Sequence, residues 1–331
     1  MRIAVDAMGS DRAPAVEVEG AVGALLDRDD LTVVLVGDRS AIEAELARHP
    51  DAPRGRIEVV EAAEVIDPGE PPVPAIRRKP NSSIVIGTRL VKAGEADAFL
   101  SAGSTGAVMA AAHLILRPLP GVDRPAVGTA LPAESGRFLL IDMGANVDTR
   151  PLHLLQFAHL GTIYAQDLMR IPNPRVGLLN IGHEPEKGDE QTLETYQLLK
   201  DSPTLNFIGN VEGRDVLRGV CDVLVCDGFV GNVMLKFYES MAGVIARLLQ
   251  AEMEEQGVTL DLGRLFRRLD YSTYGGAPLL GVNGVVIIAH GGSPPAAIRN
   301  GIGVAAQSVE THMVEHIAGR LAHLAEASEE T

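Results

Sequence analysis

The chain of 331 residues has no tryptophan, only 4% aromatic residues and two cysteines. Cys221 and Cys226 are separated by Asp-Val-Leu-Val, a spacing that suits neither a zinc knuckle nor a redox Cys-x-x-Cys pair. We therefore expect both to be core thiols of a protein in a reducing compartment. Hydrophobic residues still make up 46% of the chain, so the predicted core is aliphatic and rich in alanine.

Long hydrophobic runs are also absent, because none approaches the roughly 18 residues that a membrane-spanning helix needs. The N-terminal Met-Arg-Ile-Ala-Val-Asp enters a strand pattern directly, without a signal-peptide hydrophobic region. Positive charge is in deficit, and the net charge is −15. This balance disfavours a broad nucleic-acid footprint and leaves anionic ligands to local basic clusters. The expected location is the cytoplasm, at most in contact with a membrane surface.

Several catalytic signatures are missing from the sequence. Lys187 lacks the preceding Gly-x-x-x-x-Gly of a Walker A loop, and Gly301-Ile-Gly-Val-Ala-Ala lies inside a helical stretch instead of directly after a strand. The chain has no His-Glu-x-x-His, no clustered Cys and His, and no Gly-x-Ser-x-Gly. Dinucleotide binding, zinc chemistry and serine-hydrolase chemistry are therefore disfavoured.

Short apolar runs alternate with helical patterns, which predicts an α/β fold whose mostly parallel sheet is covered by helices on both faces. The predicted strands are 3–5, 32–36, 57–60, 98–100, 138–141, 176–179, 206–208, 223–225 and 285–288. The predicted helices are 14–27, 40–48, 82–92, 151–169, 190–200, 232–256 and 294–325. Residues 67–74 are expected to form a rigid exposed loop, and the acidic tail 326–331 is expected to fray.

Six of the predicted strands are followed by loops rich in glycine and polar residues. Ligands of parallel sheets bind at the carboxyl ends of the strands, so we expect these loops to share one site. The loops begin at Asp6, Ser101, Asp142, Asn180, Asp227 and His290.

The loop Ser101-Ala-Gly-Ser-Thr-Gly opens a helical stretch that ends before Pro118. Gly103 and Gly106 are expected to let backbone approach a ligand, and Ser104 or Thr105 to cap the helix. The amides of the first helical turn would then favour an anion such as phosphate. The alternative is a tight turn ahead of a buried, alanine-rich helix.

Three further side chains are candidates for catalysis. Lys187 lies among acidic residues in the loop after 176–179, and its alternative is a lysine in a solvated acidic turn. Lys236 follows Asn232 by four residues, so on a helix starting near Gly231 both would lie on one face close to its N-terminus; a surface lysine is the alternative. His290 ends an apolar strand and suits acid/base or oxyanion duty, or else is a capped structural histidine.

The segment 257–274 interrupts the alternation of strands and helices. A short helix there would place apolar side chains along one stripe with arginines alongside, which suits a membrane surface or a protein partner. Packing of this stripe into the core is the alternative. The stripe consists of Leu262, Leu265, Phe266 and Leu269.

Taken together, these motifs resemble the bacterial phosphate acyltransferases of phospholipid synthesis. The matching stretches run in the same order over nearly the whole chain. They are Asp6-Ala-Met-Gly, Ser101-Ala-Gly-Ser-Thr-Gly-Ala, Asp142-Met-Gly-Ala-Asn-Val-Asp, 151–165, Asn180-Ile-Gly through Glu-Lys-Gly, Asp227-Gly-Phe-Val-Gly-Asn-Val-Met-Leu-Lys and Tyr274-Gly-Gly-Ala-Pro-Leu-Leu-Gly-Val. The chain departs from the family's usual residues in having Ser104 for Asn, His183 for Glu, Phe237 for Thr and Ser240 for Gly.

The resemblance implies a reaction in which inorganic phosphate and a fatty acyl chain on acyl carrier protein give acyl phosphate and free carrier protein. It implies a fold similar to phosphotransacetylase and isopropylmalate dehydrogenase, a sandwich with two lobes around a cleft in a single domain over 1–327, followed by a frayed tail at 328–331. A homodimer that associates peripherally with the membrane is also implied. The resemblance implies no metal or organic cofactor.

Site residues are assigned from the resemblance and the loop positions together. Phosphate is expected to bind at Ser101, Gly103, Ser104, Thr105 and Gly106. Catalytic roles are expected for Lys187, Asn232, Lys236 and His290. Substrate contacts are expected from Asp6, Gly9, Asn146, Asp148, Asn180, Gly228, Phe229, Gly231 and Gly291, and carrier-protein contacts from Arg77, Arg78 and Lys79. The rival functions are a phosphotransacetylase-like enzyme that uses acyl-CoA and a non-catalytic adaptor for carrier protein or membrane.

Overall fold

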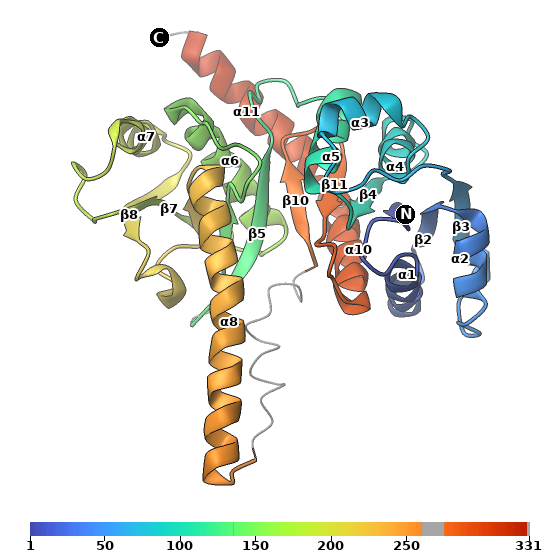
Figure 1. Ribbon diagram of the computed structural model, residues 1–331. Helices are drawn as coiled ribbons and strands as arrows, with labels where there is room; N and C mark the ends of the chain where they lie inside the picture. The colour runs from blue at the N-terminus through green and yellow to red at the C-terminus, as the bar shows by residue number, and fades with distance from the viewer. Residues whose placement is uncertain (135, 260–274, 330–331) are drawn as a thin grey trace. The chain divides into compact units, whose positions relative to one another are not determined.

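The structure is a computed structural model that describes residues 1–134, 136–259 and 275–329 (Figure 1). The chain forms two compact units. Unit 1 comprises residues 1–127, 166–170 and the described residues from 275 onward, and unit 2 comprises 128–165 and 171–259.

The strands of unit 1 follow the order β3-β2-β1-β4-β11-β10. Neighbours are parallel except β10, which is antiparallel to β11. Their bounds are β1 Arg2–Asp6, β2 Thr32–Gly37, β3 Ile57–Glu61, β4 Ala98–Ser101, β10 Ala277–Leu280 and β11 Val285–Ile288. The apolar runs form strands because almost every residue of β1, β2, β4 and β11 is buried, as in a sheet covered on both faces.

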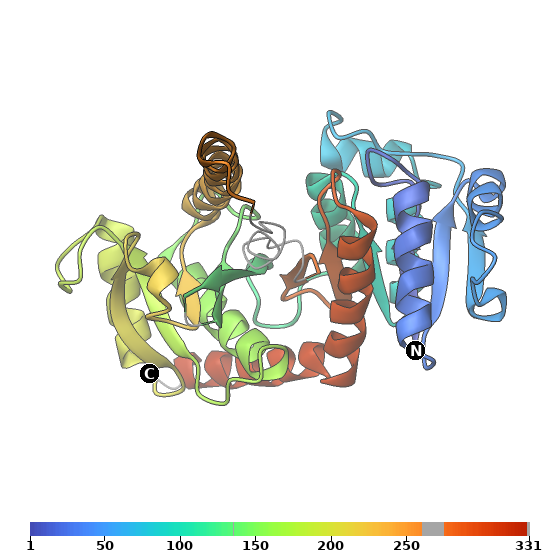
Figure 2. The same ribbon diagram turned by 90° about the horizontal axis from the view of Figure 1, so that it is seen from below.

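Helices α1, α2, α4 and α10 of unit 1 pack on this sheet, and α1 and α10 lie side by side in both views (Figures 1 and 2). The helices are α1 Ala15–Asp27, α2 Arg39–Leu46, α3 Pro72–Arg78, α4 Ser83–Lys92, α5 Thr105–Ala111, which continues into a π-helix Ala112–Leu116, α10 Pro295–Glu310 and α11 Met313–Glu329; a 3₁₀ turn covers Arg54–Arg56. Strand side chains such as Leu35 and Leu100 share a fully buried core with Leu25 of α1 and Ile298 of α10.

Unit 2 is built on the strand order β5-β6-β9-β7-β8, parallel except for β5. Strand β5 begins in unit 1, where Ala126 and Val127 pair with β10. The strands are β5 Ala126–Ala133, β6 Gly136–Ile141, β7 Arg175–Asn180, β8 Asn206–Glu212 and β9 Val223–Val225. The helices are α6 Pro151–Asp167, α7 Glu190–Asp201 and α8 Gly228–Gln256, with a 3₁₀ turn at Val216–Arg218.

The α/β architecture with a mostly parallel, helix-covered sheet is confirmed, and every predicted strand is present. Both cysteines are free and buried, as expected of core thiols, and burial raises the pKa of Cys221 to about 12. Strands β5 and β10 were not predicted from the sequence, because each contains a proline.

Three expectations about helices were wrong. The stretch 67–74 is not all loop, because α3 begins at Pro72, a residue that tolerates the first helical turn. The single helix predicted over 294–325 is two helices, separated at His312, whose φ is 52°. Helix α8 begins at Gly228 instead of near Gly231, because the Asp227 side chain caps it by accepting from the Val230 amide at 2.8 Å.

Candidate functional site

Three of the six predicted loops meet in unit 1, at the carboxyl ends of the adjacent parallel strands β1, β4 and β11. The Asp11 amide donates to the Gly291 carbonyl at 2.9 Å, joining the first loop to the third. A Cβ placed on Gly9 would lie 2.6 Å from the Gly103 amide nitrogen, so the first loop also touches the second. Glycine is required at position 9 by this close approach.

Asp6 and Ser101 form the centre of this group. The fully buried Ser101 hydroxyl donates to Asp6 Oδ2 at 2.7 Å and accepts from the Gly103 amide at 3.0 Å. Burial raises the pKa of Asp6 above its usual range, against hydrogen bonds from Ser83, Ser101 and the Met8 amide. Both polar side chains therefore hold the loops in shape.

The start of α5 matches the predicted cap. Ser104 is the N-cap residue, and its hydroxyl accepts from the Ala107 amide at 3.4 Å. Thr105 is exposed in the first turn, where helix amides lack intrahelical partners. A Cβ on Gly106 would lie 2.8 Å from Pro72 Cγ, so packing against α3 already explains that glycine.

His290 and Glu17 flank the same loops. The His290 side chain is exposed, and its Nδ1 accepts from the Gly292 amide at 3.1 Å, so a neutral ring carries its proton on Nε2. Glu17 of α1 is fully buried, and its Oε1 accepts from the Ser10 amide at 2.8 Å. Burial, with a smaller contribution from the charge of Asp6, raises the pKa of Glu17 to about 7.

The other three loops follow β6, β9 and β7, which are neighbouring strands of unit 2, and the contacts below join the loops after β6 and β9. Buried Asp142 accepts from the amide of Ala145 at 3.1 Å and from the backbone and side chain of Asn146 at 2.7 and 2.9 Å. The Gly228 amide donates to the Asn146 carbonyl at 2.8 Å. A Cβ on Gly231 would lie 1.9 Å from the Asp142 carbonyl oxygen, so α8 starts directly against this loop.

Helix α8 positions three more predicted residues. Asn232 is half-buried and lies against the loop that begins at Asp142, because a Cβ placed on Gly144 of that loop would lie 3.0 Å from Asn232 Nδ2. Lys236 is exposed one turn further along α8. The early start of α8 places Lys236 in the third turn, not near the N-terminus as expected. Phe229 in the first turn is 60% exposed, and Asp148 of the preceding loop is also exposed.

Lys187 is exposed on the loop that joins β7 to α7. Asn180 Nδ2 donates to the Lys187 carbonyl at 2.9 Å, so Asn180 holds the backbone of this loop. Gly188 in the loop has a φ of 105°, a conformation that favours glycine.

The basic triplet lies at the end of α3. Arg77 and Arg78 are exposed in its last turn, and Lys79 follows as the C-cap residue. Glu70 forms ion pairs with Lys79 and, at 3.5 Å, with Arg78. Part of the positive charge that the sequence suggested is therefore neutralised within the chain.

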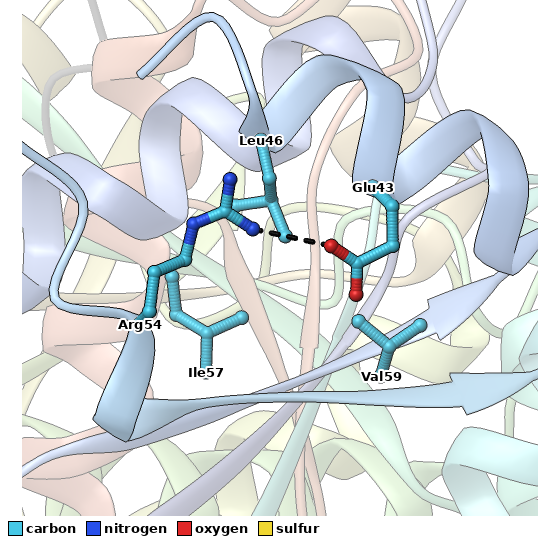
Figure 3. Close-up of a pocket in the computed structure, with 5 residues that line it drawn as sticks. All are labelled: Glu43, Leu46, Arg54, Ile57 and Val59. Carbon is cyan, nitrogen blue, oxygen red and sulfur yellow. Dashed lines mark hydrogen bonds and ion pairs between the residues drawn. The ribbon is translucent and has the colours of Figure 1, made fainter. Parts of the chain in front are cut away.

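Two pockets lie apart from the strand-end loops of unit 1. One, of about 360 Å³, lies between α2 and β3 and is crossed by the Glu43–Arg54 ion pair at 3.1 Å (Figure 3). The other, of about 440 Å³, lies beside the Lys187 loop and is lined by Pro185, Glu186, Leu193, Glu194 and Gln197. Neither contains a predicted site residue.

Two kinds of feature are absent from the described part of the chain. No helix there is long and apolar enough to cross a bilayer. No group of three or more His, Cys, Asp or Glu side chains there could hold a metal ion. The stripe predicted at 262–269 lies outside the described residues.

Sequence reasoning missed several residues that shape these loops. Ser83 bonds to Asp6, but Ser82-Ser83 reads in the sequence only as a helix start. Glu17 resembles any acidic residue in a first helical turn. No sequence signal pairs Gly144 with Asn232, because the contact is long-range.

Comparison with known proteins places the chain in a family. The family model described as "Fatty acid synthesis protein" matches residues 1–316. A protein of Heliobacterium modesticaldum named phosphate acyltransferase is 50% identical, with 97% of this chain and 99% of that protein aligned. One of the same name from Salinibacter ruber is 46% identical, with 95% and 96% aligned.

Solved structures support the fold. A phosphotransacetylase from Streptococcus pyogenes matches with a TM-score of 0.65 at 17% identity, covering 93% of this chain and 94% of that one. The EutD phosphotransacetylase from Staphylococcus aureus matches with a TM-score of 0.61 at 18% identity and the same coverage. Relatives with about 50% sequence identity align with nearly the whole chain. The chain therefore belongs to the phosphate acyltransferase family of fatty acid synthesis proteins.

Proposed function

We propose that this chain is an acyltransferase that moves a long-chain acyl group from acyl carrier protein to inorganic phosphate in phospholipid synthesis. The observation that carries the proposal is 50% identity over 97% of the chain to a protein named phosphate acyltransferase. The chemistry of the loops suits this reaction, because the loops of each unit include the start of a helix and carry exposed cationic or hydroxyl side chains.

In the proposed reaction a phosphate oxygen attacks the thioester carbonyl carbon, and the C–S bond then breaks to give acyl phosphate and the carrier thiol. Phosphate is already an anionic nucleophile near neutral pH, so positioning and charge stabilisation matter more than a strong base. The reaction needs no covalent acyl-enzyme, metal or organic cofactor.

Phosphate is assigned to the start of α5. Ser104, Thr105 and Gly106 would offer first-turn amides and the exposed Thr105 hydroxyl. Ser101 and Gly103 would act through the shape of the loop, because the Ser101 hydroxyl already bonds to Asp6.

The remaining roles concern charge and the thioester. Lys187 and Lys236, both exposed, would offset the negative charge that phosphate brings. Asn232 of unit 2 and His290 of unit 1 are each proposed as hydrogen-bond donors that stabilise negative charge developing in the tetrahedral intermediate. Asp6, Asp142, Asn146 and Asn180 would keep the loops in place through the hydrogen bonds described above.

The test is phosphate-dependent release of free thiol from long-chain acyl carrier protein, run beside the matching acyl-CoA and with Lys187→Ala. Release that requires phosphate, prefers the carrier protein and falls in the variant supports the proposal. Preference for acyl-CoA would indicate a phosphotransacetylase-like enzyme, and no release from either would indicate an adaptor.

We also propose that the chain works as a homodimer. Support comes from α8, which carries exposed apolar side chains at helical spacing, among them Val233, Phe237, Met241, Val244 and Leu248. A Phe237→Glu, Leu248→Glu variant is expected to be monomeric by light scattering, and an unchanged mass would contradict the dimer face.

Peripheral contact of a cytoplasmic protein with the membrane is the last part of the proposal. It rests on the sequence of 257–274 and on the family resemblance. Liposome sedimentation of a Leu265→Glu, Phe266→Glu variant tests it, and unaltered binding would reject this segment as the contact.

A further inference from the structure

The loop that carries Lys187 is fastened to its surroundings at several points. Asn180 at the end of β7 donates to the Lys187 carbonyl at 2.9 Å. Asn210 on the neighbouring strand β8 donates through Nδ2 to the Glu184 carbonyl at 2.8 Å. These bonds are between neutral groups and hold the backbone of residues 184–187 whatever the pH.

His183 in the same loop makes contacts of a different kind. Its Nε2 lies 3.2 Å from Asp215 Oδ2 and 3.4 Å from Glu212 Oε1, both at the end of β8 or in the turn that follows. Its Nδ1 lies 3.4 Å from the Asn210 carbonyl oxygen. The imidazole thus bridges from the loop to the β8 turn, and its attraction to two carboxylates depends on its charge.

Asp215 needs the donor that a charged His183 would provide. Its side chain is only 10% exposed, and its Oδ1 accepts from Arg218 Nη1 at 2.8 Å. Its Oδ2 is buried and accepts no hydrogen bond from the residues that the structure describes. A buried carboxylate oxygen without a donor is costly, and the Nε2 of His183 is nearer to it than Arg214 Nε, at 3.8 Å.

The other charged groups around His183 do not replace this bridge. Arg214 and Arg218 pair with Glu212 and Asp215, but all four belong to β8 and its turn, so these pairs do not reach the loop. Within the loop, the Glu184 carboxylate and the Lys187 stem lie against Gly182. The charged groups that face the bridge are Glu184, Lys187, Glu212, Arg214, Asp215 and Arg218.

We propose that His183 is a positioning residue whose protonated side chain clamps the Lys187 loop to the β8 turn, so that the hold on Lys187 weakens as pH rises. Both ring nitrogens of His183 lie near acceptors, Nε2 near Asp215 Oδ2 and Nδ1 near the Asn210 carbonyl oxygen, and only the protonated ring can donate from both. The consequence for phosphate rests on the proposed function, in which Lys187 offsets phosphate charge. A tighter loop would then lower the KM for phosphate with little change in kcat.

The test compares the full-length protein with His183→Gln, and uses His316→Gln as the matched control. His316 is 55% exposed and lies 2.9 Å from Asp167, whereas His183 is 56% exposed, so the control removes a similar histidine–carboxylate pair in unit 1. Amide hydrogen exchange of the peptide covering 181–188 is measured at pH 6 and pH 8.5. The exchange rate of each variant is divided by the wild-type rate at the same pH, which cancels the pH dependence of intrinsic exchange. The KM ratio for inorganic phosphate is measured at the same pH values, which cancels the titration of phosphate itself.

At pH 6, we expect His183→Gln to speed amide exchange in 181–188 and to raise the KM for phosphate by about twofold to fivefold, which is the effect of losing an exposed ion pair. At pH 8.5, the exchange ratio and the KM ratio should both be near one. The control should leave both ratios near one throughout. In an Asp215→Asn, Glu212→Gln background, His183→Gln should have no further effect. Unchanged exchange at pH 6 would overturn the clamp, whatever the kinetics. Faster exchange with an unchanged KM ratio would overturn the link to phosphate and the role given to Lys187.

Discussion

Two buried carboxyl groups lie beneath the loops of unit 1, and they differ in how their charge is satisfied. Asp6 accepts from Ser101 at 2.7 Å and from the Met8 amide at 3.1 Å. Glu17 accepts from the Ser10 amide, but its buried Oε2 has no hydrogen-bond partner among the described residues. Ionising Glu17 therefore places a poorly solvated charge in the core.

Glu17 should make stability fall as pH rises. Its folded-state pKa of about 7 exceeds the ordinary 4.5, so between these values the folded chain holds a proton that the unfolded chain has lost. The cost is at most about 3 kcal/mol when fully developed above pH 7. Glu17→Gln should therefore be more stable than the wild type at pH 8 and similar at pH 4.5 in thermal unfolding. Glu19→Gln, an exposed change on the same helix, is the control; equal pH dependence of wild type and Glu17→Gln would contradict the assignment.

Asn232 and His290 are the residues whose loss should affect turnover most directly. Removing one oxyanion donor typically lowers kcat by about a hundredfold to a thousandfold, because a developing charge loses a fixed donor. We expect Asn232→Ala and His290→Ala each to show such a fall in the thiol-release assay, with Asn206→Ala as an amide control on β8. If turnover survives in both variants, neither residue serves the intermediate.

Only part of the site chemistry could be predicted at this scale. Ser104 as an N-cap follows from local sequence, because its partner is three residues away. The hydrogen bond from the Ser101 hydroxyl to Asp6 does not follow from local sequence, because the two residues are 95 positions apart and meet only through the pairing of β1 with β4. Polar residues in strand-end loops were found, but whether they face a ligand or each other depends on tertiary structure.

Helices and strands were predictable where the periodicity of apolar residues was strong and the residue composition of the segment was ordinary. The buried strands and helices such as α1 and α7 match their predicted ranges closely. Strands β5 and β10 and helix α3 were missed, because each contains proline, which usually marks a turn or an edge. Pro132 of β5 and Pro278 of β10 lie where their strands pair on one side only, with β6 and with β11, so each position resembles an edge that tolerates proline. The first turn of a helix admits Pro72.

Glycine can test how closely elements pack. On α1, a Cβ at Gly20 would lie 2.6 Å from Ile298 Cβ of α10, whereas a Cβ at Gly303 of α10 would meet nothing within 4 Å. Gly20→Ala should therefore destabilise the protein by about 1–3 kcal/mol through overpacking. Gly303→Ala should stabilise it by about 0.5–1 kcal/mol through helix propensity and a restricted unfolded chain. Thermal unfolding of both variants checks this, and shifts in the same direction would refute the packing argument.

At the scale of the whole molecule, the sequence predicted six strand-end loops around one shared site, but not how the loops divide between the two units. The structure places three at β1, β4 and β11 in unit 1 and three at β6, β9 and β7 in unit 2. Strands that are neighbours in each sheet are often far apart in sequence, as β4 and β11 are. Alternation of elements gives the class of fold, whereas strand order is set by which surfaces pack together.

The net charge of −15 bears on how the chain would meet an acidic carrier protein. Overall repulsion must be overcome by local attraction, and Arg77 is the candidate because Glu70 pairs with Arg78 and Lys79. At about 0.01 M salt the Debye length is about 30 Å, against about 8 Å at 0.15 M, so salt screens the long-range repulsion and weakens the local contact.

Arg77→Glu should raise the KM for acyl carrier protein by about threefold to tenfold at low salt, because attraction becomes repulsion, and the effect should shrink at 0.15 M. The wild-type KM should instead rise with salt as the local contact is screened. Arg48→Glu makes the same change in net charge at another exposed helix end of unit 1, so it separates local from global effects. Initial rates at both salt concentrations measure this. Equal KM values for the two variants would mean that overall charge, not the end of α3, governs the encounter.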